Sequence, residues 1–90
     1  MSTHYFFPPA KAYPLNHCLF RLKSDQAYRA RFLADAEAAM DEVGLDEAAR
    51  GALRGFDRDR LVEVGAHPYL VFMADLRVRM ERTPAAFEYF

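Results

Sequence analysis

Residues 61–76, LVEVGAHPYLVFMADL, contain the sharpest break in the chain. A short apolar helix is predicted to end at Gly65, because glycine readily adopts the backbone conformation that closes a helix. Pro68 suits the first turn of a second helix, where its missing N–H is not needed. His67 lies between them, and it either caps the second helix or reaches a functional site. Two short helices joined by a tight corner are therefore expected here.

Apolar residues recur at helical spacing through residues 14–82. The stripes that we expect to be buried are Leu15, Cys18, Leu19 and Leu22; Tyr28, Phe32, Ala36 and Met40; Leu45, Ala49, Leu53 and Phe56; and Tyr69, Met73, Leu76 and Met80. The alternation that is typical of strands does not occur in the sequence. The predicted fold is therefore all-α: a compact bundle of four to five short helices with extended, aromatic-rich terminal arms.

Helix ends can also be placed from the sequence. We expect one helix over residues 25–43, with an exposed Arg31–Asp35 pair, because these residues are four apart. Gly44 suits the position after its last turn, and Asp57 can cap a short helix over residues 58–64. The chain is thus predicted to be one helical domain of 90 residues, with an arm at 1–13, a helical core at 14–82 and a tail at 83–90.

Composition excludes several classes of function. The net charge is −1, and no predicted helix is strongly basic, which argues against nucleic acid as a partner. The longest apolar run is too short to cross a bilayer, and no signal peptide is recognisable. The single cysteine, Cys18, fits a reducing compartment. We expect a cytoplasmic protein that contacts neither membrane nor nucleic acid.

The chain carries no complete catalytic set. Its histidines are His4, His17 and His67, and none forms a pair with metal-ligand spacing. Cys18 lies on an apolar stripe and is expected to be a buried structural thiol. We therefore assign no catalytic residue and no metal ligand to this chain.

Aromatic residues gather in the two terminal arms. The arms hold seven of the thirteen aromatic residues of the chain: Tyr5, Phe6, Phe7, Tyr13, Phe87, Tyr89 and Phe90. Burial of each large aromatic side chain is worth about 1.5–3 kcal/mol, which an isolated arm cannot gain. We predict that Tyr5, Phe6, Phe7, Phe87, Tyr89 and Phe90 form an interface with another subunit, and a homo-oligomer is one form of it.

Five short segments carry a resemblance to a known family. They are Tyr13-x-Leu15-Asn16, Arg31-Phe32-x-x-Asp35, the Gly44-Leu45 turn, the break at Asp57, and Gly65-Ala66-x-x-Tyr69. With these segments in this order, residues from about 13 to 76 resemble the small (alpha, LigA-like) subunit family of protocatechuate 4,5-dioxygenase and related class III extradiol ring-cleavage dioxygenases.

The resemblance implies a non-catalytic small subunit that caps the active site of a larger catalytic subunit. In that family the large subunit holds Fe(II) and opens a catechol-type ring with O2, in the catabolism of aromatic compounds. This chain would bind no cofactor itself, and Fe(II) is expected in the partner. The candidate substrate-pocket residues, contributed in trans, are His67, Tyr69, Asn16 and Tyr13.

Two other readings of the sequence stay open. The chain could be a stand-alone helical protein–protein interaction domain, homodimeric and without dioxygenase activity. A small DNA-binding helical domain is the weaker of the two, because the chain lacks a basic recognition helix. In each of these readings the chain is not catalytic alone, and the ring substrate and the stoichiometry are left open.

Overall fold

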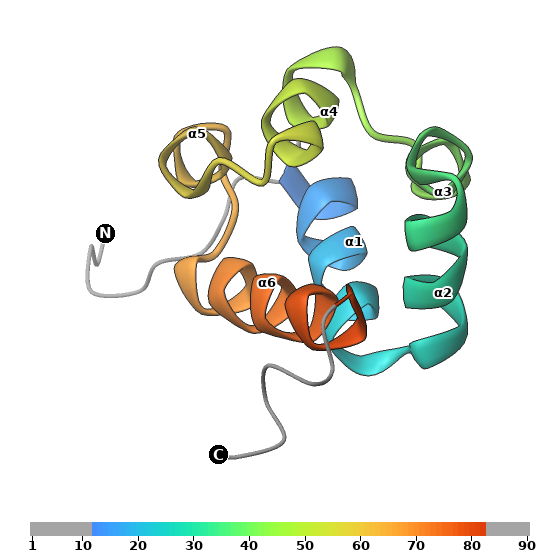
Figure 1. The fold of residues 1–90 in the computed structure, drawn as a ribbon. Coiled ribbons are helices and arrows are strands. Elements are labelled where there is room, and N and C mark those ends of the chain that lie inside the picture. The colour runs from blue at the N-terminus through green and yellow to red at the C-terminus, as the bar shows by residue number, and fades with distance from the viewer. Residues whose placement is uncertain (1–11, 83–90) are drawn as a thin grey trace.

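Six helices and no strand make up residues 12–82, the part of the chain that the computed structural model describes (Figure 1). The helices are α1 (Tyr13–Ser24), α2 (Gln26–Ala34), α3 (Ala36–Val43), α4 (Glu47–Arg54), α5 (Arg58–Glu63) and α6 (Pro68–Arg82). The all-α prediction is thus confirmed. Within these residues no helix has the length and the apolar content needed to span a membrane.

Aspartates start four of the helices. Asp25, Asp35, Asp46 and Asp57 are the N-caps of α2, α3, α4 and α5, and each side chain accepts a hydrogen bond from a backbone N–H three residues later. Such a cap typically stabilises a helix by about 1 kcal/mol, because it satisfies an N–H that has no partner inside the helix. The cap predicted at Asp57 is confirmed.

The single helix predicted over residues 25–43 is wrong, because Asp35 divides it. The backbone of Asp35 is extended, and its carboxylate accepts the N–H of Ala38 at 3.1 Å, so that α3 begins as a new helix. The predicted Arg31–Asp35 pair is absent for the same reason. Arg31 instead pairs with Glu42 at 2.9 Å. A short polar side chain that can bond its own backbone favours a cap over a helix interior.

The core is built around α1. Figure 1 shows α1 between the α2–α3 pair on one side and α6 on the other, and α1 contacts all three. The predicted stripe of α1 is buried along its whole length, with Leu15, Cys18, Leu19 and Leu22 each at most 2% exposed. Tyr28 and Met40 from α2 and α3, and Leu53 from α4, complete this core.

The buried face predicted for α6 is wrong. Val71, Ala74 and Val78 face the core, whereas Tyr69 is 55% and Met80 37% exposed. Both faces of α6 are apolar, so helical spacing alone does not distinguish them. The smaller side chains face α1, which lets the two helix backbones approach closely.

A buried arginine joins the far ends of α1 and α6. Arg29 is only 8% exposed, and its Nη1 donates to the carbonyl of Leu22 at 2.9 Å. Its Nε pairs with Glu81, near the end of α6, at 3.1 Å. The guanidinium therefore satisfies an α1 carbonyl that lacks a helical partner and is itself compensated by a carboxylate.

Candidate functional site

The corner between α5 and α6 is tied to the start of α1 by one side chain. Asn16 Nδ2 donates to the carbonyls of Gly65 at 3.0 Å and of Ala12 at 3.1 Å. Asn16 Oδ1 accepts the backbone N–H of His67 at 2.8 Å. The amide thus uses both its donors and its acceptor, and holds the two sides of the corner in a fixed relation to α1.

His67 occupies the cap position of α6. Its Nδ1 accepts the N–H of Tyr69 at 3.1 Å, and its carbonyl accepts the N–H of Val71 at 3.0 Å. Because Nδ1 accepts a hydrogen bond, the neutral ring carries its proton on Nε2. No hydrogen bond from Nε2 to another of residues 12–82 is found, and the residue is only half-buried. The ring is therefore a cap that still has one N–H to offer.

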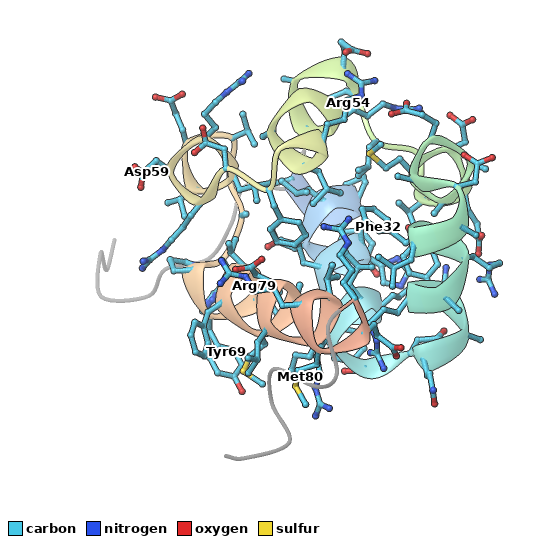
Figure 2. All side chains as sticks on the ribbon, viewed as in Figure 1. Phe32, Arg54, Asp59, Tyr69, Arg79 and Met80 are labelled. Carbon is cyan, nitrogen blue, oxygen red and sulfur yellow. The ribbon has the colours of Figure 1, made fainter. Side chains whose placement is uncertain are left out.

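The two tyrosines of the predicted pocket are open to solvent. Tyr13, at the start of α1, is 67% exposed, and its ring stacks on that of His17 with centroids 5.6 Å apart. Tyr69 is 55% exposed, in the first turn of α6, and Figure 2 shows its ring pointing away from the helix. Two aromatic side chains are thus presented near the corner with little cover from the described part of the chain.

The structure accordingly brings three of the four predicted pocket residues into one hydrogen-bonded unit: Asn16, His67 and Tyr69. Tyr13 lies one turn before Asn16 on α1, and its recorded ring contact is with His17. The sequence did not predict a role for His17, although its spacing of four from Tyr13 was a usable signal. The predicted interface residues Tyr5, Phe6, Phe7, Phe87, Tyr89 and Phe90 lie outside the described residues.

The described residues do not fit an iron site. Within 12–82 no group of three or more His, Cys, Asp or Glu side chains is placed so that it could hold a metal ion. Cys18 is fully buried, and burial raises the pKa of its thiol, which disfavours the thiolate needed for nucleophilic attack. What the corner offers is hydrogen-bond donors on a rigid support, with no reactive centre among them.

A shallow hollow lies on a different part of the molecule, between α2 and α3. It is lined by Arg31, Ala34, Asp35, Ala38, Ala39 and Glu42. Arg31 and Glu42 pair with each other, and Asp35 is occupied as a helix cap. Its polar groups therefore already have partners within the chain, and we do not assign a ligand to it.

One comparison with known proteins gives a match. The family model described as "Aromatic-ring-opening dioxygenase LigAB, LigA subunit" matches residues 15–88. Among curated proteins and among solved structures no match is found. The matched range contains Asn16, His67 and Tyr69, and begins after Tyr13.

Proposed function

The chain belongs to the LigA-subunit family of aromatic-ring-opening dioxygenases, and on this premise we propose that it is the non-catalytic small subunit of an extradiol ring-cleavage dioxygenase. The observation that carries the proposal is the family match, which extends over residues 15–88. The lack of a metal-ligand cluster within residues 12–82 supports the division of labour, in which the reaction takes place on a larger partner.

In this proposal the partner subunit holds Fe(II), which supplies the binding of the catechol-type ring and of O2. The present chain covers the partner's cleft with the α1 and α5–α6 corner and excludes bulk water. A corner fixed by three hydrogen bonds of Asn16 suits this role, because a rigid cover loses little conformational entropy on docking.

Distinct roles follow for the corner residues. The His67 Nε2–H would donate to an oxygen of the ring substrate, since Nδ1 is already engaged by Tyr69 N–H. The phenol groups of Tyr69 and Tyr13 would donate to a substrate carboxylate or phenolate. Asn16 acts as a positioning residue, because its donors and acceptor are all used to hold the corner.

Co-expression tests the proposal. Three preparations are compared: this chain alone, the product of the neighbouring gene alone, and the two co-expressed. Each preparation is assayed for iron and for ring cleavage on a panel of catechols. We expect iron and activity to follow the large subunit, and this chain to raise the activity and narrow the range of rings cleaved. Iron-dependent ring cleavage by the isolated chain would contradict the proposal. Tagged chain that recovers only its own copies would favour the homodimeric interaction domain instead.

A further inference from the structure

Helix α6 has two apolar faces on opposite sides. Val71, Ala74 and Val78 form the face against the core. At about 100° per residue, a second apolar stripe lies roughly 180° away from them. We call it the outer face of α6, and it consists of Tyr69, Phe72, Met73, Leu76 and Met80.

The outer face is not covered by the described part of the chain. Phe72 is 60% exposed, Tyr69 55% and Met80 37%, and the other two residues are half-buried. Figure 2 shows Tyr69 and Met80 pointing to the same side of α6, away from the other helices. A surface helix of a soluble protein usually has one apolar stripe, and a continuous second one marks an interaction site.

Two arginines lie beside the outer face. Arg77 and Arg79 border it, and both are exposed. Both acids of α6 are in ion pairs: Asp75 pairs with Arg79 at 2.9 Å, and Glu81 with the buried Arg29 at 3.1 Å. The outer face is therefore an apolar stripe with a cationic border.

This border argues for a partner other than a second copy. A symmetric pair of outer faces would bring arginines of one chain close to arginines of the other, and like charges at an interface oppose association. A surface with an apolar groove and carboxylates along its edges matches both the stripe and its border. The two methionines suit such a groove, since their unbranched side chains adapt to its shape.

We propose that the outer face of α6 is the surface by which this chain docks on its larger catalytic subunit, in an apolar groove edged by carboxylates. The identity of the partner rests on the proposed function. Tyr69 is the first residue of the outer face and is also bonded to His67. Docking through α6 therefore places the corner at the end of the interface, where it can reach a cleft in the partner.

A matched pair of substitutions tests the docking surface. Phe72→Glu places a carboxylate in the middle of the stripe, and Phe20→Glu makes the same change at a phenylalanine of α1 that is 50% exposed. Affinity for the co-expressed large subunit is measured by titration calorimetry, with helical content checked by circular dichroism. We expect Phe72→Glu to weaken binding by more than about tenfold, and Phe20→Glu to change it by less than about twofold.

The charged border is tested in the same assay. Arg77→Glu should weaken binding to the large subunit, and raising the salt concentration should weaken wild-type binding more than that of Arg77→Glu. If Arg77→Glu bound the large subunit as tightly as wild type at low salt, the proposal that carboxylates edge the partner's groove would be wrong.

The outcomes separate this inference from the proposed function. If the wild-type chain binds the large subunit through α6 but does not alter ring cleavage, the docking surface stands and the capping function fails. If it raises ring cleavage and Phe72→Glu binds as well as wild type, the function stands and the docking surface is wrong. The inference is also overturned if the isolated chain forms a dimer that Phe72→Glu dissociates while binding to the large subunit is unaffected.

Discussion

The side-chain oxygen of Asn16 accepts the backbone N–H of His67 at 2.8 Å, across 51 residues of sequence. This bond fixes the cap of α6 relative to α1. Together with the bond from Asn16 to Gly65, it ties the start of α6 to the first turn of α1. The position of the candidate pocket residues and the direction of the outer face of α6 both depend on it.

Asn16→Ala should destabilise the fold. The substitution leaves the Gly65 carbonyl and the His67 N–H without their partner, and a partly buried polar group left unpaired costs about 1–3 kcal/mol. Urea denaturation at neutral pH measures the loss. His17→Ala is the control, because the neighbouring side chain is exposed and its removal should cost less than about 0.5 kcal/mol. Equal stability of the two variants would contradict the role of Asn16.

Two glycines should respond to alanine in opposite directions. Gly44 ends α3 with a φ of +73°, where an alanine is strained by about 1 kcal/mol or more. Gly55 ends α4 with a φ of −93°, and a Cβ there would meet no atom within 4 Å. Gly55→Ala should therefore stabilise the protein by about 0.4–1 kcal/mol, because it restricts the unfolded chain. Thermal unfolding of Gly44→Ala and Gly55→Ala measures both changes in stability. A loss of stability in Gly55→Ala would contradict the prediction.

Local chemistry made much of this fold predictable. The stripe of Leu15 and Cys18, the terminator at Gly44 and the cap at Asp57 depend on side chains close in sequence, and each is found as predicted. Asp35 was misassigned because an aspartate four residues after an arginine fits both an exposed helical pair and a helix cap. In the structure the Asp35 carboxylate accepts the Ala38 N–H, so the residue caps α3 and does not pair with Arg31.

Tertiary contacts decided the features that the sequence did not predict. α6 has two apolar faces, and its tertiary packing against α1 selects the one that is buried, which no local pattern shows. Asn16, His67 and Tyr69 meet as one hydrogen-bonded unit. Their contact with a ring substrate stays a prediction, because it depends on a partner outside this chain.

Stability at acid pH should depend on Glu42. The hydrogen bond from Arg31 holds the pKa of this carboxyl below its ordinary value of 4.5. Desolvation acts in the opposite direction and is smaller, and the hydrogen bond from Arg21 lowers the pKa further. Its contribution is present above pH 4.5 and is lost as the pH falls through the lower folded-state pKa. Glu42→Gln should therefore lower the urea midpoint at pH 7 and have less effect near pH 3.

The control for this prediction is Asp59→Asn, on the exposed side of α5. Asp59 forms no ion pair with another residue of the described range, so its substitution should shift the midpoint little at either pH. If Glu42→Gln lowered the midpoint by the same amount at pH 7 and near pH 3, the charge of Glu42 would not be the cause.

Stability at alkaline pH should depend on Cys18 and Tyr28. Both side chains are buried, and the Cys18 sulfur lies 3.4 Å from the Tyr28 hydroxyl oxygen. The Tyr28 hydroxyl also donates to the Ala39 carbonyl at 2.7 Å. Burial is the main reason that the pKa of the thiol is raised above 9.0 and that of the phenol above 10.0. In the unfolded chain both groups lose their protons first, so the free energy of unfolding should fall as the pH rises above these values.

Tyr28→Phe separates the contribution of the phenol from that of the thiol. At pH 7 it should cost about 1–2 kcal/mol, since the Ala39 carbonyl loses its buried donor. Above pH 10 the variant should lose stability less steeply than wild type, whereas Cys18→Ala should remove only the decline that begins near pH 9. Urea midpoints between pH 7 and 11 measure both slopes. A wild-type midpoint that stays constant over this range would show that neither group is held neutral by the fold.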